Sequence, residues 1–386
     1  MLGNLNLYLI RVTVFLLPAA LIVGMSGFDC SCTDRIPPSQ NLEIRNWYDL
    51  DQVRHNLAGS HTLMNDLDSS TPGYEELAGP TANSGRGWQA IGWGYWGGPR
   101  SLGGCFRGAF DGQGHEIRDL FLFSNGWGGG GLFGCVGKGG TIKNLGVIAA
   151  IATLPEDLDE FVTLDRDTVA FVSPLITCGI LAGLNMGSVS YSYAAGAVSG
   201  DGPVGGLIGT NTGTVSNCYS TADVAGSAWG TGGLVGSNGQ RQLRYSGRVA
   251  NCYSTGSVTA RGVPGYEHEH VGGLVGVNSR GSVRNSFWDF EASGQAASDG
   301  GVGRTTAEMK SIATFSGARW NIVAVTSGEL DTGYTWNIVD GQTYPFLSWQ
   351  AVSQSRSSLG DSAKAPVRSG TGSHDCPVCS ARVTDG

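Results

Sequence analysis

The chain has 386 residues, 63 of them glycine, and a formal net charge of −8. Charged residues make up only 15% of the sequence and no stretch is rich in Lys or Arg, which argues against a nucleic-acid-binding protein. Glycine exceeds twice its usual frequency of about 7%, yet Val, Leu, Ile and aromatic residues persist between the glycines, so the composition indicates many short buried strands joined by tight turns.

Residues 1–27 differ from the rest of the chain. Arg11 precedes an apolar stretch at 12–25, and the small residues Ser26 and Gly27 follow it. This length is typical of the hydrophobic part of a signal peptide and is short for a membrane span, so we predict a signal peptide, with an uncleaved N-terminal anchor as the alternative. Export would place the nine cysteines in an oxidising compartment, and because nine is odd at least one thiol stays free or pairs between chains.

Residues 28–60 are expected to form an N-terminal cap with an amphipathic helix. Asn46 is a typical N-cap residue, and Leu50, Val53 and Leu57 follow it at helical spacing. Such a helix would cover the first coil of the structure that follows.

Two stretches before residue 124 hold side chains capable of acid–base chemistry or of sugar binding. HEIRD (115–119) begins like a zinc-protease motif, but Asp119 stands where the second His is required, so the motif is absent. Asp111 in FDGQG is predicted to be a turn residue. The aromatic residues of GWGYWGG (92–98) could stack on sugar rings or cover the first coils.

An acidic stretch, LPEDLDEFVTLDRD (154–167), is predicted to be an insertion between coils. Its carboxylates, among them Asp157, Asp159 and Glu160, could bind Ca²⁺, although their order is not that of an EF-hand loop. Their mutual repulsion equally fits a solvated loop. Ca²⁺ binding therefore stays an open alternative, and the sequence predicts no other cofactor.

Residues 178–292 contain four copies of a two-part repeat. A glycine motif such as VGGLIGTNTG (204–213) is followed by a β-branched run such as TVSNCYSTADV (214–224). The core period of about 23–27 residues, longer where loops are inserted, is typical of a solenoid. The alignment places the motif leucines at Leu184, Leu207, Leu234 and Leu274, and the valines of the second part at Val189, Val215, Val249 and Val283.

The repeats predict an all-β fold, a parallel β-helix. The runs alternate with period two, and interior glycine disfavours helical repeats by about 1 kcal/mol per residue. About 25 residues supply three short strands and their turns, so equivalent positions would stack about 4.8 Å apart. The expected ladders are the small residues Ser192, Cys218, Cys252 and Ser286, the aromatic residues Tyr193, Tyr219, Tyr253 and Phe287, and the turn residues Asn217, Asn251 and Asn285.

The sequence GGLIGTNTGTVSNCYSTADV and its copies resemble GLUG-motif repeats, which occur in bacterial and archaeal surface proteins and beside the catalytic domains of immunoglobulin-A-cleaving zinc metalloproteases. The resemblance implies a right-handed parallel β-helix, similar in shape to pectin lyases, over residues 61–292. HTLMNDLDSS (61–70) and FRGAFDGQGHEIRDLFLF (106–123) resemble the lead-in coils of such arrays, and the stretches 287–315 and 335–349 resemble their exit.

Residues 293–350 are expected to form a C-terminal cap. Thr305 and Glu308 are spaced as a capping box, which predicts a short helix over 305–315. Residues 351–386 are rich in Ser and Gly and are predicted to be a disordered tail. The tail contains an isolated Cys pair, CPVC (376–379), which fits tail decoration or an intermolecular disulfide.

His268 and His270 are two residues apart and would share one face of a strand. Two imidazoles can begin a metal site, but a catalytic zinc needs at least three protein ligands and no third ligand is identifiable. A polar insertion loop is the plainer interpretation.

The sequence favours an exported, non-catalytic β-solenoid, extracellular or on the cell surface, that displays loops for adhesion or for binding glycan or protein. Its partner would be a glycan or protein of a host or neighbouring cell, and membrane contact is expected only through an uncleaved N-terminal segment. The alternative is a polysaccharide-active β-helix enzyme, a lyase or hydrolase, which needs paired carboxylates or an acid with a base on neighbouring coils. Acids are few in residues 178–292 and none repeats in register, so no catalytic residue is assigned.

Overall fold

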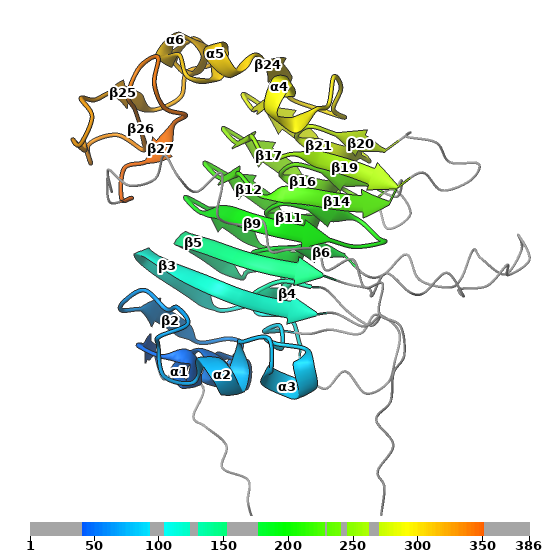
Figure 1. Ribbon diagram of the computed structural model, residues 1–386, viewed down its shortest axis with the longest axis vertical. Coiled ribbons are helices and arrows are strands. Elements are labelled where there is room, and N and C mark those ends of the chain that lie inside the picture. The colour runs from blue at the N-terminus through cyan, green and yellow to red at the C-terminus, as the bar shows by residue number, and fades with distance from the viewer. Residues whose placement is uncertain are drawn as a thin grey trace, which may run out of the picture. The chain divides into compact units, whose positions relative to one another are not determined.

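The computed structural model describes residues 41–92, 104–123, 130–152, 177–227, 230–240, 245–261 and 270–350. The predicted signal peptide or anchor and the predicted tail lie outside these residues. Within the unit Pro37–Gly386, the strands of successive coils pair in parallel and stack in chain order, as Figure 1 shows. The predicted all-β parallel β-helix is confirmed, and the right-handed sense that the resemblance implies stays a prediction.

Each repeat contributes strands to three parallel sheets. The two smaller sheets contain the glycine motif: β6 (Cys178–Gly179), β10 (Val204–Gly205), β15 (Thr231–Gly232) and β20 (Val271–Gly272) in one, and β4 (Phe133–Val136), β7 (Ala182–Asn185), β11 (Ile208–Asn211), β16 (Val235–Asn238) and β21 (Val275–Asn278) in the other.

The largest sheet contains the second half of each repeat. One part of it comprises β1 (Leu42–Ile44), β2 (Ser60–Leu63), β3 (Ala109–Phe123), β5 (Thr141–Ala152), β8 (Ser188–Ser190), β12 (Thr214–Ser216), β17 (Arg248–Ala250) and β22 (Ser282–Arg284). Past a corner in each coil lie the C-terminal halves of β3 and β5. The other strands of this part are β9 (Tyr193–Ser199), β13 (Tyr219–Ser220), β14 (Asp223–Ser227), β18 (Tyr253–Ser254), β19 (Val258–Arg261), β23 (Phe287–Asp289) and β24 (Val302–Arg304).

The strand register corrects one point of the sequence alignment. Thr210 pairs with Leu184, so the residue equivalent to Leu207 is Leu181 and the prediction of Leu184 is wrong. The alignment matched the Gly-Leu pair at 183–184, whereas the fold requires the leucine that points into the coil. The four residues that do so are fully buried: Leu181, Leu207, Leu234 and Leu274.

The predicted ladders of small and aromatic residues are confirmed. Tyr193, Tyr219 and Tyr253 pair in register, and their neighbouring ring centroids lie 4.9 Å apart with the rings nearly parallel. Phe287 continues the register, and its ring packs edge-on against Phe315. The residues before them point into the coil and are buried, namely Ser192, Cys218, Cys252 and Ser286.

The predicted turn asparagines form the corner between the two parts of the largest sheet. Asn217, Asn251 and Asn285 have φ of 51°, 53° and 48°, in the left-handed region that Asn tolerates better than most residues. Tyr191 takes the same conformation at the equivalent position, with φ of 49°. A left-handed residue therefore turns the chain at the same point in each of these coils.

A second asparagine ladder, which the sequence analysis did not predict, runs through the glycine motif. Each side-chain amide donates to the next amide oxygen: Asn185 to Asn211 at 2.8 Å, Asn211 to Asn238 at 2.9 Å, and Asn238 to Asn278 at 3.0 Å. Asn185, Asn211 and Asn238 are fully buried, so these bonds satisfy polar groups that water does not reach.

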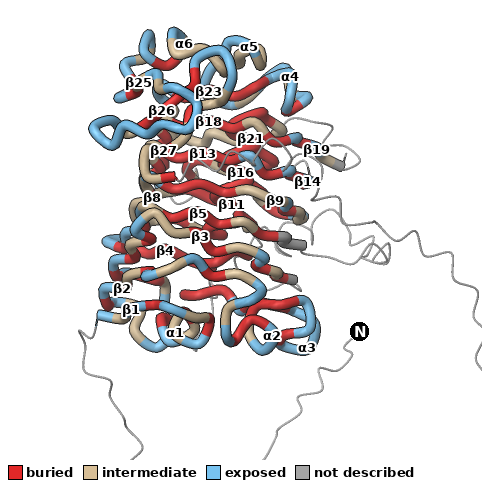
Figure 2. Tube along the Cα trace, turned by 60° about the vertical axis from the view of Figure 1, so that its left-hand side comes forward, coloured by how far each residue is buried: buried red, intermediate tan, exposed pale blue. Residues whose placement is uncertain are grey.

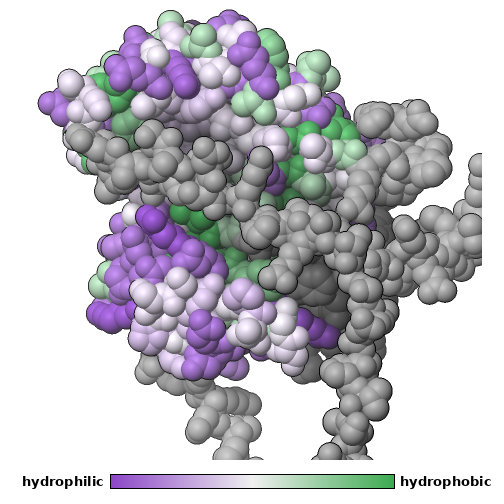
Figure 3. Space-filling view, in the orientation of Figure 1, coloured by the Kyte–Doolittle hydropathy of each residue, from purple (hydrophilic) through white to green (hydrophobic). Residues whose placement is uncertain are grey.

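Figure 2 shows the buried residues running along the coils on their inner side. In the view of Figure 3, hydrophilic residues gather over the N-terminal coils and over the C-terminal helices, with hydrophobic residues visible between them. One apolar core therefore continues from coil to coil, from Ile44 to Trp288.

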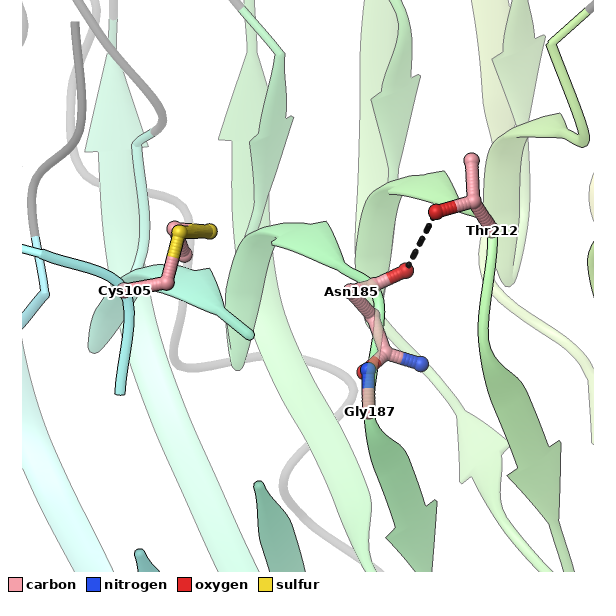
Figure 4. Close-up of a disulfide and its surroundings, with 5 residues drawn as sticks. Cys105, Asn185, Gly187 and Thr212 are labelled. Atoms are coloured by element: carbon pink, nitrogen blue, oxygen red, sulfur yellow. Dashed lines mark hydrogen bonds between the residues drawn. A yellow bond between two sulfur atoms is a disulfide. The ribbon is translucent and has the colours of Figure 1, made fainter. Parts of the chain in front are cut away.

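One disulfide joins two N-terminal coils. Cys105 and Cys135 are bonded with their Cα atoms 4.8 Å apart, and the neighbouring residues Phe106 and Val136 form a parallel bridge. Figure 4 shows the disulfide close to Asn185, the first member of the buried amide ladder. Among the described residues, the free cysteines are Cys178, Cys218 and Cys252, all of them buried.

At the N-terminal end, the predicted cap helix is confirmed, but it ends early. The Asn46 side chain accepts a hydrogen bond from the backbone N–H of Asp49, and the helix continues as α1 (Trp47–Gln52) and a single 3₁₀ turn, Val53–His55. The short helices α2 (Tyr74–Leu77) and α3 (Ala82–Gly85) follow β2. Parallel pairing begins at β1, before the helix and inside the segment expected to be the cap.

The C-terminal residues fold back along the tyrosine ladder. After α4 (Phe290–Ser293), the predicted capping box of Thr305 and Glu308 is present and begins α5 (Thr306–Met309), followed by α6 (Ile312–Gly317). The small sheet of β25 (Ile322–Ala324), β26 (Trp336–Ile338) and β27 (Phe346–Leu347) lies beside the coils in Figure 1. The fold-back reaches the coil of Tyr191, whose backbone oxygen accepts from the Trp349 indole at 3.1 Å.

We expect Asn211→Ala to lower the free energy of unfolding by about 2–4 kcal/mol, because it leaves the buried amides of Asn185 and Asn238 without this partner. Thr212→Ala, the neighbouring control, removes one long bond of 3.4 Å and should cost less than about 1 kcal/mol. Urea unfolding monitored by circular dichroism measures both. Equal losses in the two variants would contradict a structural role for the ladder.

We expect mass spectrometry of the unreduced protein to find a Cys105–Cys135 bridge and free thiols at Cys218 and Cys252. Burial, and then the neighbouring Cys252 thiol, raises the pKa of Cys218 well above its usual range, so these thiols should react with an alkylating reagent only after unfolding. Detection of a Cys218–Cys252 bridge would overturn this expectation.

Candidate binding surface

The outer side of β5, β8, β12, β17 and β22 carries two straight rows of side chains, all of them polar except Ala250. In each of β8, β12 and β17 the central valine is buried, so the residues on either side of it point outward. We call these outward side chains the polar face. Register places Thr141, Ser188, Thr214, Arg248 and Ser282 in one row and Lys143, Ser190, Ser216, Ala250 and Arg284 in the other.

The N-terminal end of the polar face is held by Asp111. Its carboxylate pairs with Lys143 at 3.0 Å and accepts from the Asn144 side chain and the Gln113 backbone, each at 3.0 Å. Burial raises the pKa of Asp111, but the three donors together outweigh burial and hold it below its ordinary value. The prediction that Asp111 is a turn residue is confirmed, since its bond to the backbone N–H two residues on forms an Asx turn.

The C-terminal end of the polar face is hollowed between two coils. Ser246, Gly247, Val249 and Ala250 line a hollow of about 570 Å³ together with four longer or polar residues, Arg248, Arg280, Ser282 and Arg284. We call it the arginine hollow. Its three arginines are exposed.

The acids and histidine of HEIRD (115–119) are engaged in contacts within the protein. The buried Glu116 carboxylate accepts from the Tyr193 hydroxyl and pairs with Arg118. His115 lies 3.2 Å from Asp66, and Asp119 accepts from the backbone of Ser69. These contacts fix the N-terminal coils to one another and to the tyrosine ladder.

Four of the five candidate metal ligands lie outside the described residues, so metal binding there stays a prediction. Asp157, Asp159, Glu160 and His268 lie outside the described ranges, as do the aromatic residues 93–98 and the CPVC pair. His270 precedes β20, and its backbone oxygen accepts from Thr231. Across the described ranges no three His, Cys, Asp or Glu side chains gather into a metal site.

None of the helices in the described ranges has the length and apolar composition needed to cross a membrane.

The model of the GLUG motif matches residues 202–225 and 227–259, which confirms the resemblance over these two stretches. A protein of Evansella cellulosilytica named "Putative Gly-rich membrane protein" is 35% identical over 94 residues, which are 23% of this chain and 10% of that protein. The match therefore spans about a tenth of the relative's length.

Among solved structures, one described as a putative immunoglobulin A1 protease from Bacteroides ovatus aligns with 80% of this chain and 92% of its own, at 19% identity and a TM-score of 0.49.

We expect Asp111→Asn to destabilise the protein by about 1 kcal/mol at neutral pH, because the amide keeps its acceptor oxygen but loses the charge that Lys143 pairs with. A carboxyl whose folded pKa is lowered stabilises the fold above its unfolded pKa of about 3.9, and this contribution is lost as pH falls through the folded pKa. The difference between wild type and variant should therefore vanish in acid. Unfolding measured at pH 7 and near pH 3 tests this, and a pH-independent difference would exclude the charge as the cause.

Proposed function

We propose that this chain is an exported, non-catalytic β-solenoid of the cell surface that adheres to glycan through its polar face. The observation that carries the proposal is the pair of straight outward rows, in which Ser188, Ser190, Thr214 and Ser216 are all partly exposed. Hydroxyl groups donate and accept hydrogen bonds, as sugar hydroxyls do, so the face is chemically matched to the hydroxyl groups of a polysaccharide.

The geometry of the rows favours an extended partner. Equivalent side chains repeat at strand spacing, about 4.8 Å, and continue across several coils in one direction. Because the side chains stand on strands whose register is fixed, little conformational freedom is lost on binding. Weak contacts repeated along a polymer, and repeated again among copies on a surface, would raise avidity.

Two carboxylates of the N-terminal coils, Asp111 at the end of this face and Glu116 past the corner, support a binding role over the enzyme alternative. Polysaccharide cleavage needs an acid and a base free to act on the substrate. Asp111 is paired with Lys143, and Glu116 is buried under Tyr193 and Arg118. Both side chains are used to hold the coils together.

Two observations support export and surface display. The apolar segment 12–25 is typical of a signal peptide, and the relative with the matching 94 residues is named a membrane protein. The inserted loops 154–167 and 262–269 lie outside the described residues.

The full chain should bind immobilised glycans and release no sugar from them. Ser216→Tyr should lower the affinity at least tenfold by blocking the middle of the polar face, while thermal unfolding stays unchanged because the side chain points outward. Ser316→Tyr, on exposed helix α6, is the matched control and should bind as wild type does.

A glycan array and an assay for reducing and unsaturated sugar ends would be run on the same samples. Glycan binding that Ser216→Tyr leaves intact would exclude the polar face. Reproducible sugar release by the wild type would favour the polysaccharide-active enzyme.

A further inference from the structure

We infer that Arg248, Arg280 and Arg284 form a site for the charged groups of an acidic polysaccharide. The inference rests on the proposed function, since it names the ligand class for one end of the polar face.

The three arginines come from two successive coils and meet through the strand register. Arg248 begins β17 and pairs with Ser282, while Arg284 ends β22 and pairs with Ala250. Each outward arginine therefore has a small residue beside it on the neighbouring strand. Both arginines and these two small neighbours line the hollow of about 570 Å³.

Arg280 lies in the turn that leads into β22 and lines the same hollow. Its φ of 71° is in the left-handed region, which is uncommon for a residue with a long side chain. Gly281 follows it and leads into β22. The turn thus places a third positive charge on the hollow that the two strand arginines already line.

The positive charges of the hollow are not neutralised by described neighbours. The ion pairs among the described residues involve Arg45, Arg54, Arg118, Arg304, Lys143 and His115 and none of the three arginines of the hollow. The chain as a whole carries a net charge of −8, so this is a local concentration of positive charge on an acidic protein. Such a concentration attracts anions locally without making the whole surface basic.

The chemistry of the hollow points to carboxylate or sulfate groups. A guanidinium group binds either of them with two parallel hydrogen bonds, and this planar match is stronger than a neutral hydrogen bond. The hollow opens onto the rows of serine and threonine, which suit sugar hydroxyls. An acidic polysaccharide carries both kinds of group, so its acidic groups match the arginines and its hydroxyl groups match the serines and threonines.

The test measures binding of the full chain to polygalacturonate, which carries carboxylates, to dextran sulfate and to neutral dextran. Wild type should prefer the two acidic polymers, and this preference should weaken with added salt. Arg248→Gln, Arg280→Gln and Arg284→Gln should each lower affinity for them about tenfold, and Arg284→Lys should lower it less because it keeps the charge but loses the paired hydrogen bonds.

The matched control is Arg86→Gln, an exposed arginine at the end of α3 with the same change of charge. It should change affinity by less than about twofold, since it lies outside the hollow. Thermal unfolding of every variant should match wild type, because all four side chains are exposed.

Several outcomes would overturn the inference. If wild type binds neutral glycans and the arginine variants bind equally well, the proposed function stands and the charged site fails. Equal losses from Arg86→Gln would show a general charge effect. Polyglutamate or double-stranded DNA binding as tightly as the acidic polysaccharides would exclude a polysaccharide-specific site.

Discussion

Buried asparagine amides hold the four repeat coils of Asn185, Asn211, Asn238 and Asn278 in one register. A single step of slippage would break every bond of the ladder at once and leave the amides of Asn185, Asn211 and Asn238 buried without partners. The stacked tyrosine rings and the left-handed corner residues repeat with the same register. The straightness of the outward rows, and therefore the polar face, depends on this constraint.

The repeated glycines are required for a specific steric reason. A Cβ on Gly206 would lie 2.4 Å from the carbonyl oxygen of Gly233, and one on Gly205 would lie 2.6 Å from the backbone nitrogen of Gly236, both on the next coil. Both distances are far shorter than any real carbon contact, so a side chain at either place would force the coils apart. The repeated glycine pair thus permits the close approach on which the amide ladder relies.

The parts of the fold that repeat were predictable from the sequence, and the parts that occur once were not. Cys218, Cys252 and the tyrosines occupy equivalent places in successive copies, so alignment alone stacked them correctly. The first copy is irregular, and there a second Gly-Leu pair led to Leu184 in place of Leu181. The disulfide of Cys105 and Cys135 lies in lead-in coils with no clear period, and spacing alone does not determine pairing.

The surface features could not be predicted from the sequence, for a related reason. The arginine hollow arises because large and small residues alternate diagonally across two coils, and this arrangement becomes visible only when the exact register is known. The fold-back of the C-terminal residues rests on single contacts, such as those of Trp349 and Gln350, that follow no sequence period. Neither the repeat period nor the local secondary-structure propensity predicts the hollow or the fold-back contacts.

The fold-back also changes how the solenoid responds to a pulling force or to heat. A stack of repeats ordinarily frays coil by coil from its end, because each coil contacts only its neighbours. Here the C-terminal fold-back is hydrogen-bonded to several coils: Trp320 donates to Asn285, Tyr253 donates to Pro345, and Trp349 donates to Tyr191. The last coils cannot separate until this segment detaches, so the array resists unravelling as one mechanical unit, which would suit the proposed adhesive role.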